Sequence, residues 1–468
     1  MSSVAGTGMP LDPAHEVVER ALAAATAGRC AVIVEERSEV DVRFANNTTT
    51  TNGQRRDRRV TVVSFHAGAS GTAVGVASRS GGGDVAELVA AAESDARAAT
   101  AAEDEAPLVT AGGASDFADA PVLTGFDAVA PVVAGLREVF DEARAARRVL
   151  SGFASHESTT TYLGTSAGTR LRHVQPTASL QLVARAADGA ASAWAGAGGD
   201  RLAPDAIVAL NERVTTRLSW AARRIELPPG HYDVVLPPDA VADLMIVLAE
   251  AASGRDAEDG RSVFSRPGGG TRIGDVLSDS PLRLSSDPLA HGLACQPFVA
   301  AGASSSDVSV FDDGAAIGPT RWVEGGRLER LRYHRAGAAR SGAEFTPPVD
   351  NLTLELPGAV ASLDEVVAGT ERGLLLTCLW YIREVDLATL LLTGLTRDGV
   401  YLVEHGEIVG AVNNFRFNES PVDLLGRVVD AGRSERALSR EWGEWMSRTA
   451  MPTLRVAEFN MSSVSPAS

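Results

Sequence analysis

Residues 374–417 read LLLTCLWYIREVDLATLLLTGLTRDGVYLVEHGEIVGAVNNFRF, and this stretch decides the fold of the second half of the chain. Leucine, β-branched and aromatic residues dominate it, a composition typical of β-strands. Arg397-Asp398-Gly399 and His405-Gly406 are turn signals within it. We therefore predict short turns between four strands, over 374–385, 390–395, 400–404 and 407–417.

The neighbouring sequence extends this β-rich region in both directions. Upstream, the Pro228-Pro229-Gly230 segment ends one helix and precedes a strand over 231–236. The other predicted elements of this half are a helix over 239–252, a strand over 326–335, a helix over 422–440 and a strand over 453–459. We place a domain boundary at the Pro-Pro-Gly segment, so that residues 231–468 form a β-rich C-terminal domain.

Residues 1–227 have a different pattern, in which helices and strands are mixed. Predicted helices cover 14–28, 84–100, 127–150 and 204–224, and predicted strands cover 30–45, 58–67, 72–77, 159–163 and 170–186. Residues 48–53 are predicted to be a hairpin loop, with the arginine run at 55–59 as its solvated tip. The fold class is therefore α+β, with an N-terminal α/β domain of mixed sheet and long helices.

Composition excludes several functions. All 43 basic residues are arginine, and with 60 acidic residues the formal net charge is −17. A chain without lysine forms no Schiff base and has no P-loop lysine. Its acidity argues against nucleic acid as a partner. No apolar run reaches the ~18 residues of a membrane span, and Met1–Pro10 does not resemble a secretory leader.

One short serine motif has two possible interpretations, and two histidine motifs are incomplete. Gly164-Thr165-Ser166-Ala167-Gly168 matches the pattern of a hydrolase nucleophile elbow, but a strand-like segment follows it where a helix is required, so it also fits a hairpin. His15-Glu16 and His156-Glu157 each begin a zinc motif that no second histidine completes. The three scattered cysteines, Cys30, Cys295 and Cys378, favour reduced thiols in the cytoplasm.

Three segments together resemble the TldD/PmbA family: 374–381, 391–399 and 410–420, with support from 451–465. The resemblance covers most of 231–465 and implies a barrel-like C-terminal domain. In the catalytic subunit of such metallopeptidases, a His-Glu-x-x-x-His motif on the first helix of this domain and a late cysteine bind zinc. Here that helix reads DAVADLMIVLAE over 239–250, no histidine occurs between His231 and His291, and Cys378 is the last cysteine.

The resemblance therefore implies the PmbA/TldE type of subunit, with no catalytic residue, metal ligand or cofactor of its own. Zinc is expected in a homologous TldD-like partner, and the complex is expected to degrade or mature unstructured peptides. For a peptide that adds to a sheet edge, we predict four binding residues on one extended segment, Asn413, Asn414, Arg416 and Asn418, because amides and guanidinium suit a peptide main chain. The same residues also fit a structural role, in which the asparagines close their own turns and Arg416 pairs with an internal acid. The alternative is a peptide-binding or maturation accessory that acts alone.

Overall fold

The computed structural model describes residues 12–26, 28–189 and 191–465. The Met1–Pro10 segment lies outside these ranges. The chain is α+β, as predicted. Its described strands fall into a six-stranded sheet and a larger, branched sheet. Among these residues, no helix combines the length and the apolar composition that crossing a membrane requires.

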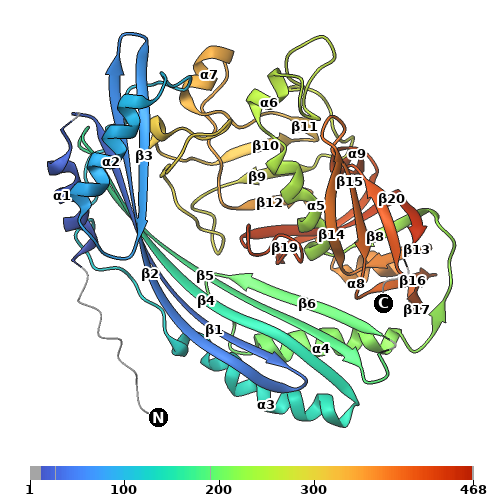
Figure 1. Cartoon of the computed structure of the whole chain (residues 1–468). Helices are drawn as coiled ribbons and strands as arrows, with labels where there is room; N and C mark the ends of the chain where they lie inside the picture. The colour runs from blue at the N-terminus through green and yellow to red at the C-terminus, as the bar shows by residue number, and fades with distance from the viewer. Residues whose placement is uncertain (1–11, 27, 190, 466–468) are drawn as a thin grey trace.

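The first sheet is an antiparallel array in the order β3-β2-β1-β4-β5-β6. Its strands are β1 (Cys30–Ala45), β2 (Thr48–Gly68), β3 (Gly71–Ser80), β4 (Arg148–Thr165), β5 (Arg170–Ala186) and β6 (Ser192–Gly199). Four helices accompany it, α1 (Ala14–Ala24), α2 (Val85–Ala98), α3 (Ala130–Ala145) and α4 (Ala206–Trp220). Figure 1 shows the long strands sweeping beneath the C-terminal half, with α3 and α4 on the outer face.

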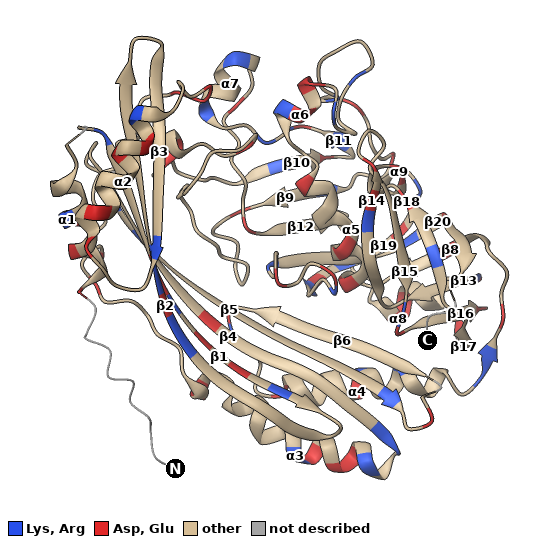
Figure 2. Ribbon diagram, in the orientation of Figure 1, with Lys and Arg blue, Asp and Glu red and all other residues tan. Residues whose placement is uncertain are grey.

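Alternation in β1 explains which face is covered. Val40, Val42 and Phe44 are buried in the cluster that includes α3 and α4, whereas Glu39 and Asp41 point to the opposite face. Successive side chains of a strand point to opposite faces, so one face of the sheet is apolar and the other is charged along this segment. Figure 2 shows basic and acidic residues side by side along β1 and β2.

The hairpin between β1 and β2 corrects the sequence-based prediction. Residues 48–53 are strand, and the turn is formed by Asn46 and Asn47, whose φ angles are 51° and 56°. Two adjacent residues with positive φ are characteristic of a type I′ hairpin turn. The arginine run 55–59 therefore lies within β2 and not at the hairpin tip, although only Arg58 of its five side chains is buried. It lies opposite the acidic residues of β1, and Arg58 forms a buried ion pair with Glu36.

The second sheet contains the remaining strands and branches at β20. They are β7 (Arg224–Ile225), β8 (Gly230–Leu236), β9 (Arg283–Ser286), β10 (Thr320–Glu324), β11 (Arg327–Leu328), β12 (Leu352–Glu355), β13 (Arg372–Leu376), β14 (Leu379–Asp386), β15 (Leu391–Thr396), β16 (Val400–Glu404), β17 (Glu407–Val412), β18 (Phe415–Glu419), β19 (Val428–Ala437) and β20 (Thr449–Val464). The helices of this half are α5 (Pro238–Glu250), α6 (Gly254–Glu258), α7 (Arg335–Ser341), α8 (Leu363–Ala368) and α9 (Pro421–Leu425).

Four predicted elements of this half differ from the structure. The helix predicted over 422–440 ends at Leu425, and most of the remainder is β19, paired antiparallel with β20. Gly432 permits this path, because a Cβ there would lie 2.6 Å from the carbonyl oxygen of Ala361. The strand predicted over 326–335 is limited to β11. The strands predicted over 374–385 and 407–417 are each divided in two.

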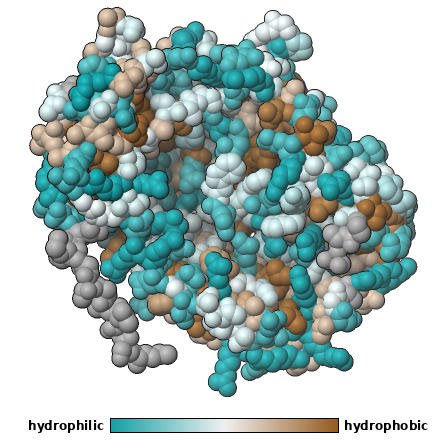
Figure 3. All heavy atoms as spheres, viewed as in Figure 1, coloured by the Kyte–Doolittle hydropathy of each residue, from teal (hydrophilic) through white to brown (hydrophobic). Residues whose placement is uncertain are grey.

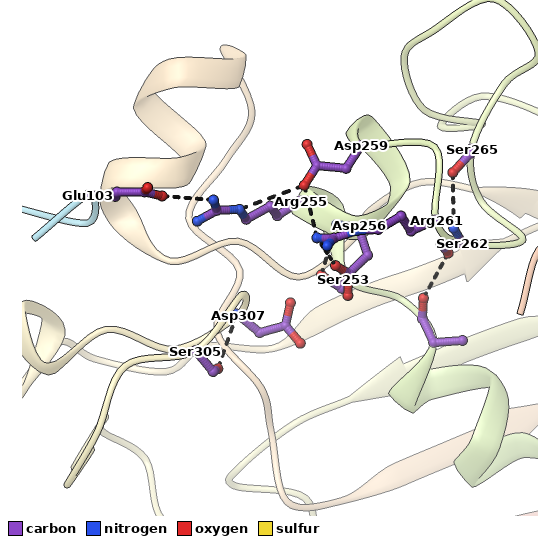
Figure 4. A network of polar contacts seen from close by, with 11 residues as sticks. Glu103, Ser253, Arg255, Asp256, Asp259, Arg261, Ser262, Ser265, Ser305 and Asp307 are labelled. Atoms are coloured by element: carbon purple, nitrogen blue, oxygen red, sulfur yellow. Dashed lines mark hydrogen bonds and ion pairs between the residues drawn. The ribbon is translucent and has the colours of Figure 1, made fainter.

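Polar and apolar contacts join the two halves. The carboxylate of Glu103 lies 2.7 Å from Arg255 of α6, and the Glu103 carbonyl accepts a hydrogen bond of 2.6 Å from Arg340. Figure 4 shows the Glu103 side chain, which belongs to the N-terminal half, pointing toward Arg255. Arg255 is part of the network of arginine and aspartate side chains drawn in that figure. Phe65 of β2 also contacts Phe311 of the short 3-10 helix Val310–Asp312, with ring centres 4.9 Å apart and the ring planes tilted by 51°. The two halves are thus joined by an apolar contact of β2 and by polar contacts of the segment that follows α2.

Candidate functional site

Helix α5 occupies the position at which the resemblance places a metal-binding motif. It begins after β8 with Pro238 at its first turn, and residues 239–248 are all buried. A largely apolar helix that is buried along most of its length belongs in a core, and α5 packs against β20. Its acidic residues Asp239 and Asp243 are one turn apart and therefore share a face.

The two aspartates bind the segment that follows β19. The carboxylate of Asp243 accepts hydrogen bonds from the Ser439 hydroxyl at 2.5 Å and from the Glu441 N–H at 2.9 Å. Asp239 accepts the Leu438 N–H at 3.0 Å. Burial raises the pKa of both carboxyls, and that of Asp243 to about 8. The acids of α5 are thus structural anchors with little access to water.

Arg440 belongs to the same segment and connects the two sheets. Its guanidinium carbon lies 5.1 Å from the ring of Trp194 on β6 and 4.6 Å from the ring of Trp380 on β14. These are cation–π distances. Its Nη2 is 3.8 Å from the carboxylate of Asp398, and its side chain is only 14% exposed. Cys378 lies in this neighbourhood, and burial raises the pKa of its thiol.

The residues around α5 do not fit a zinc ion. Zinc in a peptidase needs neutral imidazole or thiolate donors and one open position for water. Here Oδ1 of Asp243 already accepts two hydrogen bonds, burial raises the pKa of the Cys378 thiol and so keeps it protonated, and α5 has no histidine. Within residues 12–26, 28–189 and 191–465, no three His, Cys, Asp or Glu side chains are grouped as metal ligands would be.

Asn413 and Asn414 lie between β17 and β18, at a cavity. The Oδ1 atom of Asn413 accepts the Leu227 N–H at 2.7 Å, and the carbonyl of Asn414 accepts the Ser465 N–H at 2.8 Å. The cavity has a volume of about 240 Å³, and Asp398 and Tyr401 also line it. Two of the four predicted peptide-binding residues, Asn413 and Asn414, therefore form hydrogen bonds with main-chain groups of this chain beside a small cavity.

Arg416 and Asn418 lie on β18, and their strand is internal. It is paired with β15 on one side and with β20 on the other. The Arg416 side chain is exposed, and its Nη1 donates to the Thr393 hydroxyl at 3.2 Å. Because two neighbours already occupy the main-chain groups of β18, no edge of this strand is free for a peptide, and the four side chains as peptide contacts stay a prediction. The sequence does not show which strands lie at an edge.

Two short motifs have structural roles. Ser166 is in the β4–β5 turn, where its hydroxyl oxygen accepts the Cys30 N–H at 3.0 Å. Because β5 follows directly, the hairpin interpretation of the Gly-x-Ser-x-Gly segment is confirmed. Both ring nitrogens of His156 have partners, the Thr124 hydroxyl at 2.7 Å and the Asp200 carbonyl at 3.2 Å.

Exposed apolar side chains on and after β14 are a feature that the sequence does not reveal. In the described part of the chain, β14 pairs with β15 alone, so its other edge has no neighbouring strand. Four large apolar side chains are exposed on this strand, on the turn after it and on the loop following β19: Tyr381 at 52%, Val385 at 58%, Leu387 at 55% and Trp445 at 66%. Figure 3 shows apolar patches set among hydrophilic residues over the C-terminal half. In the sequence, 374–385 has the pattern of one buried strand, so the unpaired edge of β14 was not predicted.

Tyr381 is held in an unusual conformation on this face. Its φ angle is 53°, which is rare for a bulky side chain. Glu441 stabilises it, because its carboxylate accepts the Tyr381 N–H at 2.9 Å and binds Arg383 at 2.9 Å. The Arg383 guanidinium carbon in turn lies 4.2 Å from the centre of the Tyr381 ring. Residues in sparsely populated conformations persist only where their surroundings enforce them, and they cluster at functional sites.

Comparison with known proteins identifies the family. The PmbA/TldA metallopeptidase C-terminal domain matches residues 229–463, and the central domain of the same family matches 129–221. A comparison with curated proteins gave no match.

Among solved structures, TldE from Thermococcus kodakarensis aligns with a TM-score of 0.77 at 14% identity, over 96% of this chain and 99% of that one. A DNA gyrase modulator protein from Thermotoga maritima aligns with a TM-score of 0.73 at 16% identity, over 95% and 99% of the two chains. A similar protein from Bacteroides thetaiotaomicron gives 0.73 at 15%, over 97% and 100%. These identities show a shared fold, and the domain matches show descent: the chain belongs to the PmbA/TldD metallopeptidase family.

Proposed function

We propose that this chain is the non-catalytic subunit of a TldD/TldE-type zinc metallopeptidase complex that degrades or matures unstructured peptides. The proposal is supported by the burial and hydrogen bonding of the side chains on helix α5. Its two acids are buried and hydrogen-bonded to the segment after β19, and it offers no imidazole. A helix in this state supports the fold and has no open position at which a metal could activate water.

The catalytic machinery would then come from a homologous TldD-like subunit that carries His-Glu-x-x-x-His and a late cysteine. Zinc belongs to that partner, and peptide is the substrate of the complex. The three cysteines of this chain are free and buried, which supports a reducing, cytoplasmic location. The net charge of −17 favours peptides over nucleic acid as the ligand.

Metal content and activity test the proposal directly. The purified chain is expected to contain no stoichiometric zinc by mass spectrometry and to leave a fluorogenic, unstructured peptide intact. Co-expression with a homologue that carries both histidines should yield a stable complex that cleaves the peptide and loses activity on chelation. A homologue with both histidines replaced by alanine is the matched control, because it should still assemble. Stoichiometric zinc or cleavage by this chain alone would refute the proposal.

Co-purification distinguishes the proposed function from the alternative function. A stand-alone accessory protein would bind peptide without forming a complex with the His-Glu-x-x-x-His homologue. The first function requires that complex, so size-exclusion chromatography of the mixed chains distinguishes the two.

A further inference from the structure

We infer that the cavity between the two halves, beside the turn that precedes β16, is a binding site for a free α-amino acid with a small apolar side chain. Its walls come from the start of β6, the segment from the end of α4 through β7, the β15–β16 turn and the β17–β18 turn. Figure 1 shows the start of β6 and the end of α4 beneath β16 and β17. The inference does not depend on the proposed function, because the ligand is chosen from the charges and the size of the cavity.

Asp398 provides a carboxylate on one wall of this cavity. It lies in the β15–β16 turn, and its side chain is only 6% exposed. The Ser192 hydroxyl donates to its Oδ1, whereas its Oδ2 lies 3.8 Å from the Arg440 guanidinium, which is beyond hydrogen-bond distance. Both oxygens of a carboxylate accept hydrogen bonds, so Oδ2 can accept one from the ammonium group of a ligand.

The turn that carries Asp398 is held in one conformation. The φ angles of Asp398 and Gly399 are 54° and 144°, and a Cβ on Gly399 would clash with the Thr377 hydroxyl. The Gly399 carbonyl accepts the Thr377 N–H at 3.0 Å. The carboxylate is therefore in place before a ligand arrives, and a preorganised group binds at lower entropic cost.

Arg224 provides the opposite charge. The strand register places Arg224 beside Ala411 of β17, and Ala411 beside Tyr401 of β16. Paired residues of adjacent strands project to the same face, so these three side chains share one side of the sheet. Arg224 is exposed, and among the described residues its guanidinium has no ion pair. A guanidinium without an acid suits a ligand carboxylate, which it binds through two parallel hydrogen bonds.

Asn413 adds a second donor near Arg224. Its Oδ1 accepts the Leu227 N–H, whereas its Nδ2 is buried without a hydrogen-bond partner in the described part of the chain. Leu227 follows β7 and Asn413 follows β17, the parallel neighbour of β7, so both donors lie at the same end of the cavity. A buried donor without an acceptor is unfavourable, so a carboxylate oxygen that reached it would be stabilised.

The mixture of charges and the small size select the ligand. Glu226 is a second acid in the lining, so a simple anion would meet it and Asp398, and a simple cation would meet Arg224. A zwitterion has a partner for each of its charges. The volume of about 240 Å³ is below the ~300–1,000 Å³ of sites for drug-sized ligands. Ile225 and Ala411 are apolar parts of the lining, which suits a small apolar side chain.

Isothermal titration calorimetry with the full-length chain tests the site. The ligand is L-valine, compared with L-valinamide, which lacks the carboxylate, and with isovalerate, which lacks the ammonium group. L-valine should give a saturable heat, and each analogue should bind at least about tenfold more weakly, the effect of losing one charged hydrogen bond. Absence of saturable binding by L-valine, or equal binding of all three compounds, would overturn the inference.

Variants assign each charge of the ligand to its partner. Arg224→Gln should weaken L-valine binding about tenfold and remove the preference for L-valine over L-valinamide. Asp398→Asn should remove the preference over isovalerate and keep the preference over L-valinamide. Arg223→Gln is the matched control, because Arg223 is also exposed and does not line the cavity. Circular dichroism establishes that each variant is folded. Wild-type affinity in the folded Arg224 variant would contradict the site, whether or not the Asp398 variant folds.

A steric variant and a longer ligand test the position and the size of the site. Ala411→Leu places a larger side chain in the cavity wall and should abolish L-valine binding in the folded protein. Unchanged affinity would place the ligand elsewhere and overturn the inference. The tripeptide Val-Val-Val should bind at least about tenfold more weakly than L-valine, because the cavity has room for one residue. Tighter binding of the tripeptide would assign the cavity to the end of a peptide and contradict a site for a free amino acid.

Discussion

The Glu441 N–H donates a 2.9 Å hydrogen bond to the carboxylate of Asp243, although the two residues are 198 positions apart in the sequence. Through it, the buried helix α5 determines the position of an exposed tyrosine. Glu441 holds Tyr381 by its N–H and Arg383 by its guanidinium. The helix that lacks metal ligands thereby supports the aromatic face of β14.

Replacing Asp243 with asparagine should change how stability depends on pH. Burial raises the pKa of the folded-state carboxyl to about 8, while the unfolded value is about 3.9. Between these values the folded chain binds a proton that the unfolded chain does not, so wild-type stability falls as pH rises from about 4 to 8. The contribution of this group reaches about 1.4 kcal/mol per pH unit within that window.

Asparagine resembles the protonated acid and keeps an oxygen acceptor for Ser439 and Glu441. Urea unfolding at pH 6, 7 and 8 should therefore show the Asp243→Asn variant gaining stability relative to wild type as pH rises. Parallel pH profiles for the two proteins would show that Asp243 is ionised in the fold.

Replacing Arg440 with methionine should loosen the contact between the two sheets. Methionine preserves packing against Trp194 and Trp380 but removes the cation–π contacts and the charge near Asp398. We expect a loss of about 2 kcal/mol in the free energy of unfolding, measured in guanidinium by tryptophan fluorescence. Arg372→Met is the control, since this arginine is 67% exposed and should change stability by less than about 0.5 kcal/mol. Equal effects of the two substitutions would exclude a special role for Arg440.

The three thiols should be unreactive in the native protein. Cys30, Cys295 and Cys378 are buried, and burial raises the pKa of the first to about 12 and of the second to about 11. Thiolate is the reactive form, so Ellman's reagent at pH 8 should detect no thiol before denaturation and three after it. Rapid reaction of one thiol in the native state would reveal an exposed cysteine and contradict the packing described above.

Ser166 should contribute to stability and not to hydrolysis. Its hydroxyl oxygen accepts the Cys30 N–H at 3.0 Å at the tip of the β4–β5 hairpin. Ser166→Ala should cost about 1 kcal/mol on urea unfolding, the value of one such bond. Ser64→Ala is a matched control, because the buried Ser64 hydroxyl has no hydrogen-bond partner among the described residues. A fluorophosphonate probe that labelled Ser166 would support a hydrolase instead.

Local sequence was sufficient where one strand or helix has a single strong pattern. The predicted bounds of β1 and β5, Cys30–Ala45 and Arg170–Ala186, agree with the structure because alternating side chains identify one buried face. Local sequence failed for 422–440, where helix-forming residues are overridden by pairing with β20. Tertiary pairing outweighs intrinsic propensity, which amounts to less than about 1 kcal/mol per residue for such residues.

By itself, the amino-acid sequence determined the absence of lysine chemistry, the α+β class and the lack of histidine on α5. These depend on which residues are present and on their periodicity. Only the tertiary structure decided which strand has an open edge, that Asp243 anchors Glu441, and that Tyr381 rather than Asn413 lies beside that edge. Edges, buried partners and pKa shifts arise from contacts between residues that are distant in sequence, and no local pattern encodes them.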